Sequence, residues 1–286
     1  MIQRIQSQGL AVLHSLARWT HLSFLSSLLN HRELCWRLTD RDVRGRYRGS
    51  VLGWSWTLIT PLLMLAVYTF VFSTVFKARW SGLEEAGPIG FAINLFAGLI
   101  VFNAFAECAT QAPTLILNNA NYVTKVIFPL EILGGVSVAT SLFHACTSTM
   151  VLLVFELLTA HTIPWTVLWL PLIWLPLALG CLALSWLLSA LGVFLRDLGQ
   201  VMGVTVSMLM FLSTVFYPLS ALPPRLQPLL SLNPLVHVID QTRQVLIQTK
   251  SPSLSYLLMG TLLSAAAAEI SYRLFSRARR GFADVL

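Results

Sequence analysis

Residues Thr39–Trp56 read TDRDVRGRYRGSVLGWSW, a dense run of arginines that stops where a long apolar segment begins. Three kinds of protein carry such a run. They are an enzyme with an Asp-x-Asp metal site, a nucleic-acid-binding protein with a basic patch, and a membrane protein whose cytoplasmic residues flank a spanning helix. The rest of the chain separates these interpretations.

The composition is that of an integral membrane protein. Hydrophobic residues make up 56% of the 286 and charged residues only 11%, with a mean hydropathy of +0.73, whereas soluble domains are about 25% charged. A helix that crosses the hydrocarbon core needs about 20 predominantly apolar residues. Six segments meet that requirement: Val51–Phe76, Ile89–Gln111, Ile132–Leu158, Val167–Leu195, Gln200–Tyr217 and Leu254–Phe275. The sequence therefore predicts an all-α membrane protein with six transmembrane helices.

The basic residues predict how these helices are oriented. Of the 19 Lys and Arg, 14 fall on the side that carries both termini and 5 on the opposite side, and basic residues near span ends are retained in the cytoplasm. We therefore expect a cytoplasmic arm over residues 1–50, a membrane domain over 51–275 and a cytoplasmic tail over 276–286. The net charge of +7 then faces anionic lipid, and nucleic acid is not expected as a partner.

The arm is predicted to form an amphipathic helix in the membrane interface. Its apolar residues share one side: Leu22, Leu25, Leu29, Trp36, Val43 and Tyr47. Four arginines share a neighbouring side: Arg37, Arg41, Arg44 and Arg48. Gly45 and Gly49, which are weak helix formers, mark a bend into the first span. Two functions fit the arm: it anchors the protein to lipid, or its guanidinium groups bind a phosphate or pyrophosphate, which their fork geometry suits.

The Asp-x-Asp pattern is a weaker hypothesis. Asp40 and Asp42 would hold a metal in a membrane-embedded transferase that acts on polyprenyl-phosphate sugars, but each aspartate has arginine neighbours that can neutralise it. The motifs G-x-x-x-x-G-K-[ST], H-E-x-x-H and G-x-S-x-G are absent from the sequence. If the protein does energised work, ATP is hydrolysed on another chain, and no cofactor is expected in this one.

The loop between the second and third spans reads NNANYVTKVIFPLE, Asn118–Glu131. Asn121 is a candidate cap for a short helix over Tyr122–Phe128, which Pro129 interrupts. Exposed to the cytosol, such a helix offers a soluble ATPase a place to bind. The alternative is an ordinary loop. The residues of interest are Asn118, Asn121, Tyr122, Val123, Lys125 and Phe128.

The outer segment Tyr217–Gln248 contains five prolines and cannot form one continuous helix. Asn233 followed by Pro234 predicts a helix cap with proline at the first helical position. From there Leu235, Ile239, Thr242 and Leu246 line one face of an amphipathic helix. The segment is predicted to be re-entrant or interfacial, which is permitted where protein or water satisfies the backbone.

Four ionisable groups lie within or near the spans: Glu107, His144, Glu156 and Glu269. Each is a functional hypothesis, because charges within the membrane are costly. Only His144 lies deep, and a packed, hydrogen-bonded histidine explains it better than a proton-coupled transporter, in which paired carboxylates at mid-membrane are expected.

Six stretches carry a resemblance to a known family. In order they are DRDVRGRYRGSVLGWSWTLITPLLMLAVYTFVFSTVFK, NANYVTKVIFPLEIL, LGVFLRDLGQV, YPLSALPP, LNPL and RARRGFADVL. They resemble the membrane subunit of ABC-2 type polysaccharide exporters, the family that secretes capsular polysaccharide, O antigen and teichoic acid. The resemblance covers about residues 35–286, and Met1–Asn30 match nothing in it.

The resemblance implies a homodimer in the bacterial inner membrane that works with two copies of a nucleotide-binding subunit, where ATP and Mg bind. It implies that the arm is an interface helix, that Asn118–Phe128 are the coupling helix and that Pro218–Gln248 are gate helices. The gate candidates are Pro218, Pro223, Pro224, Arg225, Asn233 and Pro234. A capsule system would add a periplasmic or outer-membrane partner.

The implied substrate is a lipid-linked glycan, whose phosphate enters at the cytoplasmic interface. The candidates for this phosphate-recognition and interface-helix site are Arg37, Arg41, Arg44, Arg46, Tyr47 and Arg48. A sugar chain slides along aromatic faces, and the candidates for the channel lining are Trp54, Trp56, Tyr68 and Phe72. An ABC-2 exporter of a drug or simple lipid, which shares the fold, remains an alternative.

Overall fold

The computed structural model describes residues 23–75, 87–124, 128–161 and 163–286. These residues form helices and turns with no strand among them, which confirms the all-α prediction. Within them, five helices are long and apolar enough to cross a membrane. Their main helical segments are α4 (Trp56–Thr69), α5 (Gly87–Gln111), α7 (Ile132–Ala160), α8 (Leu170–Phe194) and α12 (Leu254–Ala278).

The fifth predicted span is shorter than expected. It forms α9 (Leu198–Leu212), whose 15 residues extend about 22 Å, against about 30 Å for the hydrocarbon core. The predicted end at Tyr217 is therefore wrong. The helix stops because Thr214 adopts a left-handed backbone conformation, with φ of 55°, and the chain then turns into the proline-rich outer segment.

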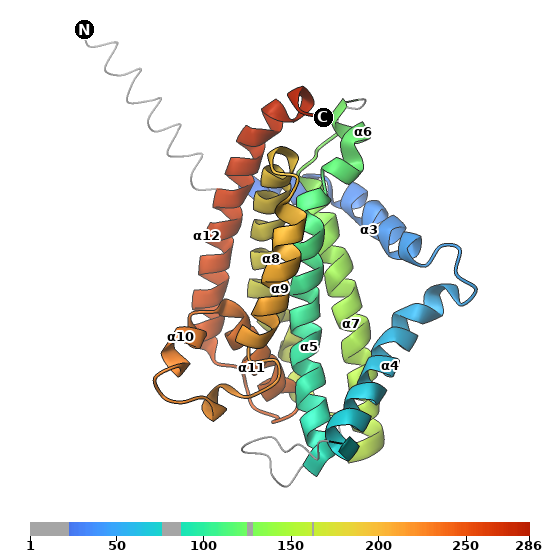
Figure 1. Cartoon of the computed structure of the whole chain (residues 1–286), viewed down its shortest axis with the longest axis vertical. Helices are drawn as coiled ribbons and strands as arrows, with labels where there is room; N and C mark the ends of the chain where they lie inside the picture. The colour runs from blue at the N-terminus through green and yellow to red at the C-terminus, as the bar shows by residue number, and fades with distance from the viewer. Residues whose placement is uncertain (1–22, 76–86, 125–127, 162) are drawn as a thin grey trace.

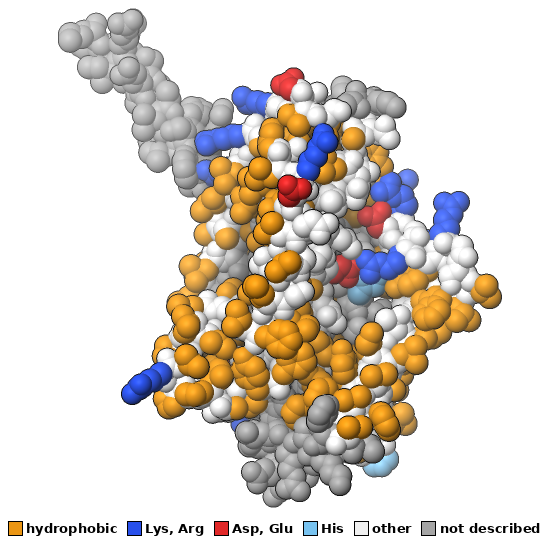
Figure 2. Space-filling model, viewed as in Figure 1, with side chains coloured by type: hydrophobic (Ala, Val, Ile, Leu, Met, Phe, Trp, Pro, Cys, Tyr) orange, Lys and Arg blue, Asp and Glu red, His pale blue; other side chains and the backbone are white. Residues whose placement is uncertain are grey.

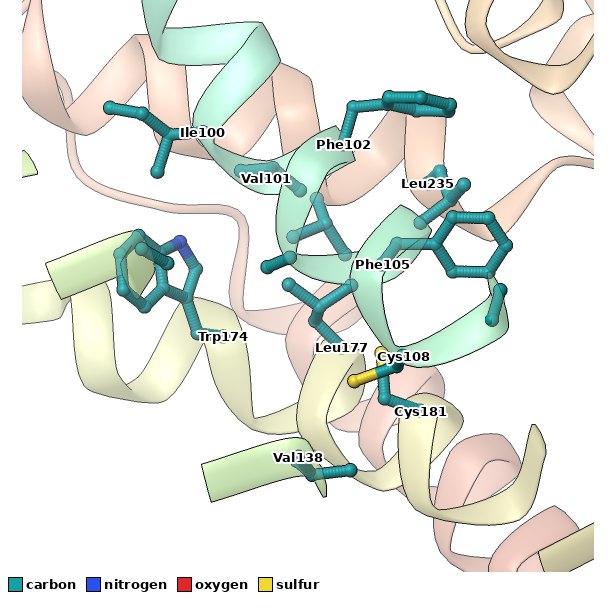
Figure 3. Close-up of a cluster of buried hydrophobic side chains, with 14 of the residues drawn as sticks. Ile100, Val101, Phe102, Phe105, Cys108, Val138, Trp174, Leu177, Cys181 and Leu235 are labelled. Carbon is teal, nitrogen blue, oxygen red and sulfur yellow. The ribbon is translucent and has the colours of Figure 1, made fainter. Parts of the chain in front are cut away.

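Helix α5 lies at the centre of the bundle (Figure 1). Inside the protein, 78% of its spanning window is buried, compared with 17% for the windows of the first and last spans. Side chains of α5, α7, α8 and α11 meet in this core, among them Phe102, Trp174 and Leu235 (Figure 3). The outer spans leave broad apolar faces uncovered by protein, as the space-filling view shows (Figure 2), and these faces suit lipid or a further subunit.

The N-terminal arm differs from the single helix that was predicted. It forms α2 (Ser23–Asn30) and α3 (Arg32–Arg46). The side of α3 that packs against α7 carries Leu38 and Val43, while Trp36 is 75% exposed. Of the predicted apolar stripe, Val43 is buried while Leu25, Leu29 and Trp36 are exposed, and Leu22 lies outside the described residues. Insertion of this stripe into lipid stays a prediction.

The end of α3 agrees better with the sequence. The helix stops at Arg46, and Gly49 has a φ of 87°, which glycine adopts without strain. Gly49 thus lies at the predicted bend, whereas Gly45 lies inside α3.

The elements predicted to be cytoplasmic gather at one end of the molecule (Figure 1). Helix α3, the short helix α6 (Ala120–Thr124) and the C-terminal turn at Arg279–Asp284 all lie there. Phe282 of that turn is fully buried against Phe194 and Phe275, and Arg279 forms an ion pair of 2.7 Å with Glu131 at the start of α7. Most of the charged side chains visible in Figure 2 also gather at this end.

Two further helices lie at the opposite end: α10 (Gln227–Ser231) and α11 (Pro234–Leu246). Asn233 caps α11, since its side-chain oxygen accepts a hydrogen bond of 3.0 Å from the amide of Leu235. The predicted Asn-Pro cap is therefore confirmed. Helix α11 buries Leu235, Ile239 and Leu246 against α5 and α8, so it is packed into the bundle rather than free in solution.

Candidate functional site

A pocket of ≈ 500 Å³ lies where α3 meets α5 and α7. It is lined by Arg41, Asp42, Gly45, Arg46, Gln111, Leu115, Ser137 and Thr140. Four of these residues, Arg41 to Arg46, belong to α3. Counted from Arg41, the other three lie one, four and five positions later, so all four share one helical face. Packing of the neighbouring face on α7 directs them into the pocket.

The wall contributed by α7 contains two hydroxyl groups that lack partners. Ser137 is 4% exposed and Thr140 is 5% exposed, and neither hydroxyl oxygen has a hydrogen-bond partner among the described residues. A buried polar group without a partner is costly. Both oxygens are themselves buried, so a ligand in the pocket that accepts hydrogen bonds would satisfy them only after the two side chains rotate toward it.

Arg46 joins the arm to the two central spans. Its guanidinium forms an ion pair with Glu107 of α5. The Nδ1 atom of His144 on α7 lies 3.0 Å from the same carboxylate and 3.3 Å from Nη1 of Arg46. The predicted packed and hydrogen-bonded His144 is therefore confirmed. The sequence did not reveal this three-residue cluster, because its members are 61 and 37 positions apart.

Arg41 connects the pocket to helix α6. Its Nη1 donates a hydrogen bond of 2.8 Å to the hydroxyl of Tyr122, while Nε and Nη2 both donate to one carboxylate oxygen of Asp42, at 3.2 and 3.0 Å. Burial acts to lower the pKa of the Arg41 guanidinium, but the bonds to Tyr122 and Asp42 outweigh it, so the pKa is raised. Arg41 therefore stays charged at any physiological pH.

The remaining phosphate-recognition candidates lie outside the pocket wall. Arg37 and Arg44 form helix-surface ion pairs with Glu33 and Asp40, at 2.6 and 2.7 Å, and such exposed pairs contribute little to stability. Arg48 is exposed beyond the end of α3, and Tyr47 is half-buried there. Of the six candidates, the structure thus brings two, Arg41 and Arg46, to one pocket.

The aspartates of the Asp-x-Asp pattern are both paired with arginine. Asp40 binds Arg44, and Asp42 binds Arg41 at 3.0 Å. Over the described part of the chain, no group of three or more His, Cys, Asp or Glu side chains is placed to hold a metal ion. The site thus combines two arginines, Arg41 and Arg46, with the carboxylates that pair with them, Asp42 and Glu107.

The coupling-helix candidates divide into an inner and an outer set. Tyr122 and Val123 are half-buried and pack toward the core, and Tyr122 stacks on Phe128 with ring centroids 4.3 Å apart. Asn118 and Asn121 are exposed. Asn121 lies inside α6, so the predicted cap at this residue is wrong; Lys125 lies outside the described residues. The exposed asparagines are therefore Asn121 on α6 and Asn118 on the turn before it, Leu117–Asn119.

All four channel-lining candidates have specific neighbours within the subunit. Tyr68 packs beside Phe72, and the indole of Trp56 donates a hydrogen bond to Ser50. Trp54 is 52% exposed, although its ring meets Phe143 edge-on at 5.9 Å. A lining role for these residues stays a prediction.

Asn233 is the gate candidate with the most specific contacts, because it joins α11 to the end of α9. Its Nδ2 donates hydrogen bonds to Ser213 Oγ at 2.9 Å and to the carbonyl of Leu212 at 3.3 Å. Arg225, Pro223 and Pro224 are exposed on the connecting segment. Their role in a gate stays a prediction.

Arg243 on α11 is a charged residue buried inside the protein. It is 3% exposed and donates hydrogen bonds of 2.7 to 2.9 Å to the carbonyls of Asn94, Thr214 and Val215. Asp240 lies 3.7 Å away. Arg243 thus ties α11, the end of α9 and the central helix α5 together.

Comparison with known proteins places this architecture. The model of the ABC-2 type transporter family matches residues 33–247, most of the chain. The O-antigen export system permease protein RfbA of Myxococcus xanthus is 26% identical over 265 residues, 92% of this chain and 99% of that protein. The polysialic acid transport protein KpsM of Escherichia coli is 22% identical over 82% of this chain and 90% of its own length. The inner membrane transport permease YadH of Escherichia coli is 29% identical over 66% of this chain and 75% of its own length. The chain belongs to the family of ABC-2 type transporters.

Proposed function

We propose that this chain is the permease of an inner-membrane exporter of lipid-linked polysaccharide, either an O antigen or a capsular polysaccharide. As a membrane subunit of an ABC transporter, it works with an ATPase subunit. The relatives named for O-antigen export and polysialic acid transport support this substrate class, since each aligns over most of both chains.

The observation that carries the proposal is the pocket between α3, α5 and α7. Arg41 and Arg46 supply positive charge, and Ser137 and Thr140 supply buried hydroxyl donors without partners. A phosphate or diphosphate needs both kinds of group, because it is an anion with several acceptor oxygens. The pocket lies beside the interface arm, at the depth where the headgroup of a lipid carrier would sit.

The remaining elements fit an export cycle. Two copies of the chain would form the conduit. Two ATPase subunits, each binding ATP and Mg, would dock on α6 and the turn before it, through Asn121 and Asn118. The sugar chain would pass between the subunits along aromatic faces. The segment Pro218–Gln248 would close the outer mouth, and in a capsule system a periplasmic or outer-membrane protein would continue the path.

The test measures surface polysaccharide in cells that lack the native gene and co-express the partner ATPase with each variant. Ser137→Ala with Thr140→Val removes the two unpartnered hydroxyls while keeping the helix surface apolar. We expect unchanged or higher thermal stability and export reduced by about tenfold, because only the ligand loses hydrogen bonds. Arg37→Gln, a change on the exposed side of α3, is the matched control.

Full export by the double variant would contradict the assignment of the pocket. Normal assembly with the ATPase but transport of a simple lipid or drug in place of polysaccharide would instead contradict the substrate class. These two results are distinguishable. The first compares export by the double variant with export by wild type, whereas the second identifies what the wild-type complex transports.

A further inference from the structure

Arg41 belongs to two parts of the molecule at once. It lines the pocket, and it also binds the hydroxyl of Tyr122 on α6, 81 positions later in the chain. Helix α6 connects the central span α5 to α7, and it is the element on which the proposed function places the ATPase. One side chain therefore contacts both the proposed headgroup site and the proposed docking helix.

The bonds of Arg41 differ in strength. Nε and Nη2 bind the carboxylate of Asp42, whereas Nη1 binds a neutral phenol. A guanidinium forms stronger hydrogen bonds with an ionised acceptor than with a neutral one. These bonds use three of the five guanidinium N–H groups. A phosphate in the pocket would bind the remaining N–H groups of Nη1 and Nη2 and draw the guanidinium toward itself, and the bond to the neutral Tyr122 hydroxyl, which is the weakest of the three, would break first.

Tyr122 is held so that a change at its hydroxyl is transmitted to its helix. Its ring stacks on Phe128 at an interplanar angle of 13°, and both rings pack against the core. Because α6 has only five residues, a shift of this tyrosine moves the whole helix. The neighbouring Asn121 is exposed on the same helix and would move with it.

We propose that the Arg41–Tyr122 hydrogen bond senses an anionic lipid headgroup in the pocket: the headgroup takes the Arg41 guanidinium, Tyr122 is released, and α6 then raises ATP hydrolysis on the partner. This inference rests on the proposed function, since it needs the pocket to bind the headgroup and α6 to contact the ATPase. If the headgroup changes nucleotide affinity as well as the rate of hydrolysis, linkage requires the nucleotide to change headgroup affinity by the same factor.

The experiment uses the complete transporter in lipid nanodiscs, with a polyprenyl diphosphate as the ligand and the uncharged polyprenol as its control. Binding of the diphosphate and the rate of ATP hydrolysis are measured for wild type and Tyr122→Phe. The phenylalanine keeps the ring that stacks on Phe128 and removes only the hydroxyl. Tyr256→Phe, at an exposed tyrosine near the outer end, makes the same chemical change far from the pocket.

We expect the diphosphate, but not the polyprenol, to raise ATP hydrolysis by wild type and Tyr256→Phe about fivefold or more. Tyr122→Phe should still bind the diphosphate, but its basal rate should already equal the stimulated rate and should not rise further. Stimulation of Tyr122→Phe equal to that of wild type, with binding intact, would overturn the sensor and leave the proposed function standing. Absence of diphosphate binding to wild type would instead overturn the proposed function and the sensor with it.

A second variant covers the case in which Tyr122→Phe does not assemble with the ATPase. Arg41→Lys keeps a positive charge, but a single ammonium lacks the fork that binds Asp42 and Tyr122 together. It should show the same raised basal rate. A basal rate equal to that of wild type would overturn the sensor.

Discussion

Arg46 at the cytoplasmic end and Arg243 at the outer end are bound by different kinds of group. Arg243 is buried and donates to three backbone carbonyls of α5 and the end of α9. Arg46 is partly exposed, binds the side chains of Glu107 and His144, and lines an open pocket. Carbonyls fixed in the backbone cannot turn away, whereas side chains can change partner. The outer arginine is therefore an anchor, and the cytoplasmic site is built to exchange its contacts.

The largest expected effect breaks the anchor. Arg243→Gln leaves backbone carbonyls in the core without donors, and each buried unsatisfied group costs about 1–3 kcal/mol. We expect a much lower melting temperature and poor recovery of folded protein, measured by thermal unfolding followed by size-exclusion chromatography. Arg225→Gln, an exposed arginine on the same outer segment, should behave as wild type. An equal melting temperature for the two variants would contradict the anchor.

The next variant asks whether the cytoplasmic end also contains rigid contacts. A methyl group at Gly192 of α8 would overlap the backbone carbonyl of Pro113, whereas one at Gly203 of α9 would meet no atom within 4 Å. Overpacking a core costs about 1–3 kcal/mol, so Gly192→Ala should lower the melting temperature and Gly203→Ala should not. Equal melting temperatures for the two alanine variants would contradict a close contact between Gly192 and the backbone of Pro113.

The Arg46–Glu107 pair allows a smaller and more specific test. A double-mutant cycle with Arg46→Gln and Glu107→Gln should give a coupling energy of about 1 kcal/mol, because the two groups are in contact but Arg46 is partly exposed to solvent. Thermal unfolding of the four proteins gives this energy. Both single variants should lose a larger fraction of export than their small loss of melting temperature would suggest, since the arm loses its attachment to α5. Strict additivity of the two changes would show that the arm is held by its apolar face alone.

The smallest expected effect concerns the cap of α11. Asn233→Ala should cost about 1 kcal/mol, the usual value for an N-cap, together with the bonds to Ser213 and Leu212. Asn233→Asp keeps an accepting oxygen for the amide of Leu235 and should recover part of the loss. Measured melting temperatures that rank Ala above Asp would exclude the cap as the source of stability.

Local pattern was enough to predict the spans and the cap of α11. Hydropathy located the long helices, and the pair Asn233–Pro234 identified the start of α11, because both signals depend on neighbouring residues. The end of α9 at Leu212 was missed, since it is set by the turn at Thr214 and not by hydropathy. The arginine contacts were missed for a related reason: Arg243 and Asn94 are 149 positions apart, and a single sequence carries no signal of that pairing.

The most direct test of the central claim is the binding of a polyprenyl diphosphate to the complete transporter in nanodiscs. Arg41→Gln and Arg37→Gln make the same change on the pocket side and on the exposed side of α3. The account predicts that Arg41→Gln raises the dissociation constant about tenfold, equivalent to about 1.4 kcal/mol, while Arg37→Gln leaves it unchanged. Equal affinities for the two variants, or no binding to wild type, would contradict it.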